Sequence, residues 1–211
     1  MVYSFDKVSL LTLSILIVFL GASRLAGRSF AVNQRITNPT RIYKYFFLVA
    51  ISLIFSFFVF QSFQQYWVWA GNELSKNLLP PYQSANYFIF YVFTRFFAPY
   101  LISLAAALVF LFLTKILNKK YGERFFEPEE FYLGASAIFL SGHPGWLFYV
   151  VFLLAIYVLI QLFSTAKSSI LNSKFSPVRV SLYWLWIPTA IFVILIQRWL
   201  ELLPIWQILK L

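Results

Sequence analysis

Carboxylates are the side chains of this sequence whose spacing could support chemistry. Four of them gather just before an apolar run: Glu123, Glu127, Glu129 and Glu130. If Glu130 begins a membrane helix that faces the bundle interior, its partner would be Glu73, which precedes the segment Leu74–Pro80. Two carboxylates brought together can share one proton, so that one activates water and the other protonates the leaving group. The alternative is that the four glutamates form a solvated loop that balances neighbouring Lys and Arg.

Other reactive residue types are scarce. The chain has a single Asp, Asp6, near its start and a single His, His143, in a turn between two apolar runs, which is a poor context for a Ser-His-Asp triad. There is no Cys, so thiol catalysis and disulfides are excluded. No His pair or His/carboxylate cluster has metal-ligand spacing, and no Gly-rich phosphate loop is present. We therefore expect no metal and no cofactor.

Arg95 is the cation whose position is most unusual, because it lies within the apolar stretch Asn86–Leu117. An Arg in the hydrocarbon core costs about 2.5–3.5 kcal/mol on insertion scales, so it normally faces protein or water. If Pro99 marks a break between two short helices, Arg95 lies near an interface and can extend its guanidinium to the headgroups. The alternative is a functional buried cation that is paired with a carboxylate.

The composition shows which environment must hold these residues. Of 211 residues, 61% are hydrophobic and only 11% are charged, whereas soluble domains carry roughly 25% charged residues. This small number of charges cannot cover the surface of a water-soluble protein. We therefore predict a single domain, residues 1–211, embedded in a lipid bilayer. The net charge of +10 comes from basic residues between apolar runs, which indicates topogenic loop charge and not a nucleic-acid partner.

The apolar runs predict an all-α, polytopic transmembrane helix bundle with about six spans. The runs are Val8–Ala22, Tyr45–Phe60 with a less pure continuation to Ala70, Asn86–Leu117, Phe131–Leu140, Trp146–Phe163 and Leu182–Leu203. They are apolar on all faces, whereas the strands of a membrane barrel alternate, and helices satisfy every backbone group internally. The stretch Asn86–Leu117 is either one long kinked helix or two short helices that meet near Pro99, which leaves seven spans open.

Basic loops predict the orientation of the bundle. The loops Arg24–Lys44, Lys115–Arg124 and Lys167–Arg179 should all be cytoplasmic, because Lys and Arg concentrate in cytoplasmic loops. One helix across Asn86–Leu117 satisfies all three loops, with both termini outside, and so favours six spans. Such a helix would also place Glu73 and Glu130 on opposite membrane faces.

The stretch from Glu73 to about Thr189 resembles the prepilin-peptidase-type aspartyl proteases of the membrane. One catalytic Asp of that family opens an Asp-Leu-x-x-x-x-Ile-Pro segment, and Glu73-Leu74-Ser75-Lys76-Asn77-Leu78-Leu79-Pro80 stands in the same register. The other Asp closes a Gly-x-Gly-Asp motif, where this chain has Glu127-Pro128-Glu129-Glu130. The family's later Gly-aromatic-Pro turn is similar to Ser141–Trp146, and the segment before its final helix is similar to Arg179–Leu182.

The resemblance implies that Glu73 and Glu130 occupy the catalytic positions, with Arg95, Glu129 and His143 as further functional candidates. Both Asp positions read as Glu, and the family's Cys-bearing cytoplasmic domain is absent. The expectation is therefore a diverged, non-catalytic relative that assists pilus or secretion machinery, and its peptidase-like framework covers about residues 73–189.

Two other classes of function stay open. One is a small transport or complex-assembly subunit without hydrolytic ancestry, suggested by Arg95 and the helix-breaking Pro99. The other is a structural partner of other membrane protein subunits, whose mark would be an apolar face carrying small residues such as Ala105, Ala106 and Ala107. Because no transit peptide is visible, the default location is the cytoplasmic membrane of a prokaryote.

Overall fold

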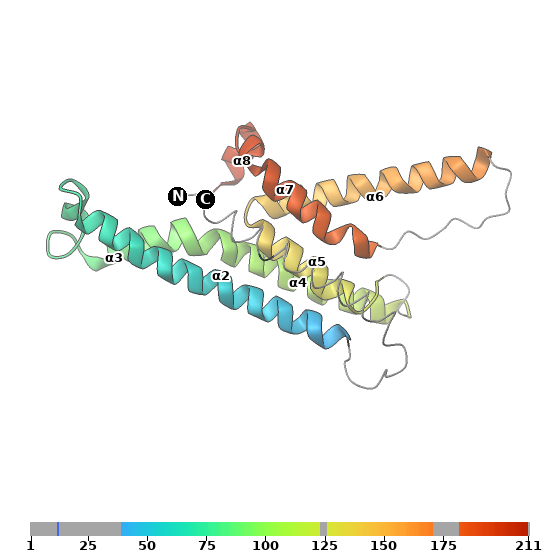
Figure 1. Cartoon of the computed structure of the whole chain (residues 1–211), viewed down its shortest axis with the longest axis horizontal. Coiled ribbons are helices and arrows are strands. Elements are labelled where there is room, and N and C mark those ends of the chain that lie inside the picture. The colour runs from blue at the N-terminus through green and yellow to red at the C-terminus, as the bar shows by residue number, and fades with distance from the viewer. Residues whose placement is uncertain (1–11, 13–38, 123–125, 171–181, 211) are drawn as a thin grey trace.

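The computed structural model describes residue 12 and residues 39–122, 126–170 and 182–210, and this part of the chain is helical with no strand (Figure 1). The predicted all-α class is therefore confirmed. The first predicted span, Val8–Ala22, and Asp6 lie outside the described residues, apart from Thr12.

Helix α2 (Pro39–Ala70) is the first long helix. It begins at a proline, which the first turn of a helix tolerates because its missing N–H would have no partner there. Its buried side chains recur every three or four residues: Tyr43, Phe47, Ala50, Ile54, Phe58, Gln61, Gln65 and Trp69. This stripe packs inward, while most of the exposed side chains beyond the basic first turns of the helix are apolar.

The stretch predicted as one kinked helix or two short ones is a single continuous helix from Ala85 to Lys120. It consists of α3 (Ala85–Val92), the π-helical turn η2 (Phe93–Phe97) and α4 (Ala98–Lys120). In the wider turn the N–H of Ala98 donates to the carbonyl of Phe93, just before Pro99, which has no N–H to donate. The π turn therefore carries the helix past Pro99 without ending it.

Helix α5 (Glu130–Ser141) lies at the centre of the molecule, against α2, α4, α6 and α7. Every residue of α5 except Tyr132 is buried. Small side chains permit this close packing: a Cβ on Gly134 would lie only 2.6 Å from Cε1 of Phe110. Gly142, with φ at 65°, then ends the helix in the left-handed region that glycine adopts without strain.

The C-terminal part is built from α6 (Gly145–Ile170), α7 (Trp186–Leu200) and α8 (Pro204–Leu209), with a short 3₁₀ turn η3 (Leu182–Trp184) before α7. A second short 3₁₀ turn, η1 (Ser75–Leu78), lies between α2 and α3. Figure 1 shows α6 diverging from α2 and α4, with its C-terminal half away from the other helices. The last predicted span, Leu182–Leu203, is divided in the structure into η3 and α7, and α7 ends at Leu200.

Three helices are long and apolar enough to cross a membrane: Thr40–Ala70, Ala85–Lys120 and Gly145–Thr165. They correspond to the second, third and fifth predicted spans and make the chain an integral membrane protein. Helices α5 and α7 measure only about 18 and 22 Å at 1.5 Å per residue, less than the roughly 30 Å of a hydrocarbon core. The count of six spans therefore stays a prediction.

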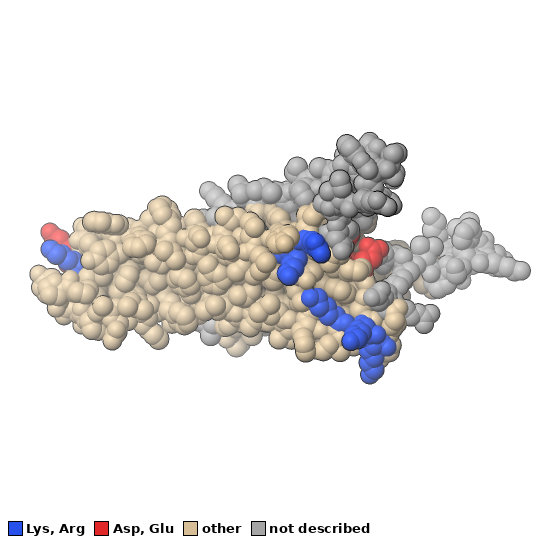
Figure 2. Space-filling view, turned by 90° about the horizontal axis from the view of Figure 1, so that it is seen from below, with Lys and Arg blue, Asp and Glu red and all other residues tan. Residues whose placement is uncertain are grey.

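Charged side chains gather toward the two ends of the long helices. Arg41 and Lys44 at the start of α2 lie at the same end as Lys115, Lys119 and Lys120 at the end of α4, and all five are exposed. The face seen in Figure 2 is uncharged between this basic region and a small charged group at the opposite end. The orientation in which the basic end is cytoplasmic stays a prediction, and residues 24–38, 123–125 and 171–179 of the three basic loops lie outside the described residues.

Candidate functional site

The structure does not bring Glu73 and Glu130 together. Glu73 is exposed in the connection between α2 and α3, whereas Glu130 begins α5, beyond the end of α4. The continuous helix Ala85–Lys120 lies between them in the chain and is about 54 Å long at 1.5 Å per residue. Figure 1 shows the α2–α3 connection at one end of the molecule and the start of α5 toward the other. Carboxylates so far apart cannot share a proton, which needs a separation of roughly 4–6 Å.

Glu130 instead stabilises the beginning of α5. Its side chain is only 3% exposed, and its Oε2 accepts a hydrogen bond of 3.0 Å from the backbone N–H of Glu127. The N–H of Glu130 in turn donates to the carbonyl of Glu127 at 2.9 Å. A carboxylate in the first turn also interacts favourably with the positive end of the helix dipole. Glu129 is half-buried at the N-cap position of α5, and its carbonyl accepts from the N–H of Leu133 at 3.2 Å.

A second polar contact, which sequence reasoning missed, holds the connection between α4 and α5. The side-chain amide of buried Asn118 donates to the carbonyl of Phe126 at 2.9 Å and accepts from its N–H at 3.1 Å. Close by, Lys115 Nζ donates to the hydroxyl of Tyr132 at 3.2 Å and lies 5.0 Å from the centre of its ring. The feature of the sequence that could have indicated this contact is Asn118 itself, an amide side chain in the last turn of an apolar helix, just before a connection.

His143 joins the α5–α6 turn to the C-terminal helix. Its Nδ1 lies 3.3 Å from the indole N–H of Trp146, and its Nε2 lies 2.8 Å from the carbonyl of Leu209. Because an indole can only donate, Nδ1 is the acceptor, and Nε2 carries the proton that is donated to Leu209. Both ring nitrogens are therefore engaged in contacts between elements of the fold.

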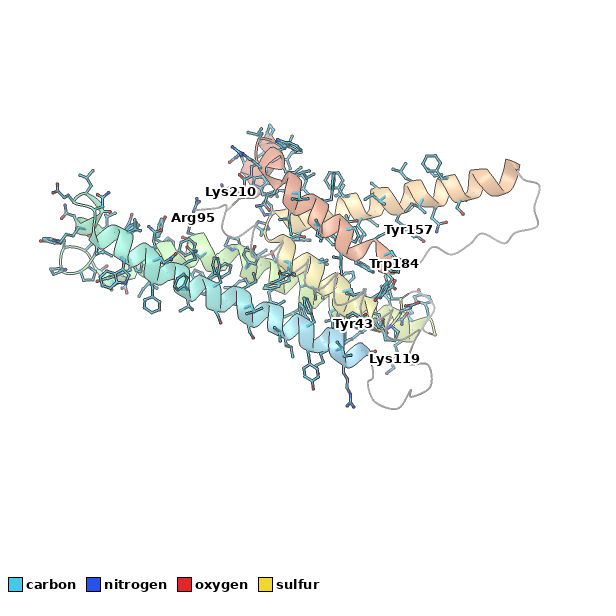
Figure 3. All side chains as sticks on the ribbon, in the orientation of Figure 1. Tyr43, Arg95, Lys119, Tyr157, Trp184 and Lys210 are labelled. Atoms are coloured by element: carbon cyan, nitrogen blue, oxygen red, sulfur yellow. The ribbon has the colours of Figure 1, made fainter. Side chains whose placement is uncertain are left out.

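Arg95 lies in the π turn η2 and is exposed. Figure 3 labels it on η2, at a distance from the basic end that Lys119 marks. Among the residues that the structure describes, no carboxylate is within ion-pair distance of Arg95. This position agrees with a side chain that reaches the membrane interface and does not support a buried functional ion pair.

Several buried polar groups connect helices or stay unpaired. The hydroxyls of Tyr43 and Tyr183 form a buried hydrogen bond of 2.8 Å between α2 and η3, and Tyr149 donates to the carbonyl of Trp186 at 3.2 Å. Two side-chain oxygens on α2, those of Gln61 and Gln65, are buried without a hydrogen-bond partner. In the described ranges no group of three or more His, Cys, Asp or Glu side chains is arranged to hold a metal ion.

Comparison with known proteins does not add a relative. No family model, no curated protein and no solved structure matches this chain. A function must therefore be argued from the chemistry of the described residues, whose polar side chains mainly hold connections and separate elements together.

Proposed function

We propose that this chain is a non-catalytic subunit of a membrane protein complex in the cytoplasmic membrane of a prokaryote. The observation that carries the non-catalytic part is the placement of Glu73 and Glu130 at opposite ends of a continuous helix. The polar side chains that sequence reasoning singled out at Glu130 and His143 already have structural hydrogen bonds.

The role as a subunit is supported by the uncovered part of α6. Beyond Leu153, which is buried, the apolar side chains Leu154, Val158, Leu162 and Phe163 are all more than half exposed. Figure 1 shows no other helix beside this part of α6 among the described residues. An apolar helix of a second membrane protein, packed against this face, is the partner that fits, because helices in lipid associate through close packing.

The Ala105–Ala107 stretch supports the subunit role less than expected. Ala107 is fully buried and Ala106 is partly buried, so only Ala105 is exposed. These small residues serve the contact between α4 and its neighbours within the chain. The descent from a prepilin peptidase and the role beside pilus or secretion machinery stay predictions, as does a transport role.

Site-specific photo-crosslinking in the source membrane tests the proposal. A benzoylphenylalanine in place of Phe163, which is exposed on α6, should give one discrete adduct with a membrane protein. The same group at Phe112, exposed on α4, should give lipid adducts and serves as the matched control. Lipid adducts alone at Phe163 would argue against a subunit partner. A second experiment measures whether the protein cleaves a prepilin-type substrate. If it does, and if Glu130→Gln abolishes that cleavage, the non-catalytic assignment is wrong.

A further inference from the structure

The long helices exceed the thickness of a hydrocarbon core, so part of them must lie outside it. Ala85–Lys120 is about 54 Å long, whereas the core measures about 30 Å and a whole bilayer about 40–45 Å. A helix of this length fits within a whole bilayer at a tilt of roughly 35–40°, the upper end of the observed range. At that tilt, about 38 Å of the length of the helix lies within the hydrocarbon core.

Polar groups mark where the core should end. Lys119 lies at the basic end of α4, and about 36 Å of helix separates it from Arg95, which matches the tilted core. Helix α2 packs against η2, with the ring centres of Phe58 and Phe97 5.6 Å apart, so Gln61, about one turn beyond Phe58, lies near the level of Arg95. The outer boundary of the hydrocarbon therefore falls near Gln61 and Arg95.

The chemistry at this level agrees with a boundary. The exposed guanidinium of Arg95 would cost about 2.5–3.5 kcal/mol at the centre of the bilayer but can be solvated among headgroups. The buried oxygens of Gln61 and Gln65 lack donors within the protein. Both oxygens are enclosed by protein, so Arg95 alone marks the boundary at this level.

Beyond the boundary lies a packed pair of helices with its connection, residues 62–94, here called the outer hairpin. The ring of Trp69 holds it together, because its centre lies 4.8 Å from that of Tyr91 and 5.4 Å from that of Phe88. Seven of its exposed side chains are aromatic, and Glu73 and Lys76 are its only charged residues. The exposed aromatic residues are Phe63, Tyr66, Trp67, Tyr82, Tyr87, Phe90 and Phe93.

We propose that the outer hairpin crosses the headgroup layer of the non-cytoplasmic leaflet and binds the lipid surface through its exposed aromatic and amide side chains. Amphipathic aromatic rings concentrate at this level of a membrane, and Gln64, Asn72 and Asn86 add exposed hydrogen-bonding groups. The apolar surface of α2 and α4 continues into the hairpin without a charged ring between them, apart from Arg95. This placement is independent of the proposed subunit role.

Spin labels on single cysteines test this placement, since the chain has no native Cys. Nitroxides at Trp67 and Phe90, in the protein reconstituted in phosphatidylcholine–phosphatidylglycerol vesicles, report collisions with oxygen and with a water-soluble nickel chelate. Phe112, exposed on α4, is the reference for hydrocarbon, and Glu127, exposed before α5, is the reference for water. The oxygen-to-nickel ratio at Trp67 and Phe90 should lie severalfold below that at Phe112 and severalfold above that at Glu127.

Three outcomes would overturn the proposal. Ratios at Trp67 and Phe90 equal to that at Glu127 would place the hairpin in water, and ratios equal to that at Phe112 would place it in hydrocarbon. Low collision rates with both reagents would show that protein covers it. A label at Phe63, which is also exposed, replaces either site if circular dichroism shows that a labelled protein has lost helix.

Discussion

Individual polar residues in this protein serve to fix the ends of helices. Asn118 pairs with both backbone groups of Phe126, and Glu130 pairs with the N–H of Glu127. These contacts determine where the connection between α4 and α5 lies, so that α5 enters the centre of the bundle. A buried backbone group without a partner is costly, which gives a single side chain a large effect on stability.

Asn118→Ala should lower the thermal stability in detergent, because it leaves the N–H and the carbonyl of Phe126 unpaired. Each such loss is worth about 1–3 kcal/mol. Asn118→Asp keeps the acceptor for the N–H and should have an intermediate effect. Asn77→Ala, at an exposed position of η1, is the control and should leave the melting temperature unchanged in differential scanning fluorimetry. Equal melting temperatures for Asn118→Ala and Asn77→Ala would contradict the assigned role.

At the scale of elements, α5 is the helix around which the others pack. Its small residues let α4 approach closely, and the rings of Phe110 and Trp186, with centres 5.4 Å apart, cover Gly134. A built Cβ at Gly134 would lie 2.6 Å from Phe110 and 3.0 Å from Trp186. The packing of α5 therefore depends on the absence of a side chain at this position.

Gly134→Ala should destabilise the protein although alanine favours a helix by about 1 kcal/mol, because overpacking costs about 1–3 kcal/mol. Gly134→Leu should have a larger effect. The expected result is a lower midpoint of unfolding in an SDS titration, with partial recovery when Phe110→Leu is added. Gly71→Ala is the control, since its nearest contact is an ordinary 3.4 Å to the carbonyl of Trp67. A stabilising Gly134→Ala would show that the two rings move aside freely.

At the scale of the whole molecule, the charges and the long helices define two ends. The end with Arg41, Lys44 and the last turns of α4 is basic, and the α2–α3 connection with Glu73 lies at the other. The positive-inside rule assigns the basic end to the cytoplasm. The absence of a carboxylate dyad at Glu73 and Glu130 follows from this geometry.

Cysteine accessibility should therefore separate the two ends. In intact cells a membrane-impermeant maleimide should label Glu73→Cys, whereas Glu127→Cys should react only after the membrane is permeabilised. Both positions are exposed, so a difference in labelling reports the side of the membrane. Labelling of both variants from one side would contradict the proposed topology and would reopen the possibility of a shared carboxylate site.

The sequence by itself determined the class of the protein and the positions of its long helices. The runs Tyr45–Phe60, with its less pure continuation to Ala70, Asn86–Leu117 and Trp146–Phe163 correspond to α2, to Ala85–Lys120 and to α6. Apolar composition and the need to satisfy backbone groups in lipid are local properties, so a linear pattern predicts them. The loop charges also favoured one helix through Pro99, although they could not show the π turn that accommodates it.

Only the tertiary structure decided the roles of the polar residues. Glu130 and Glu73 have the same side chain, yet Glu130 is buried at the start of α5, where it binds the N–H of Glu127, and Glu73 is exposed at the far end. The register between Asn118 and Phe126, and the burial of α5 among four helices, depend on how separate elements meet. Spacing along the chain cannot determine whether two carboxylates lie together, because the continuous helix between them sets their separation in space.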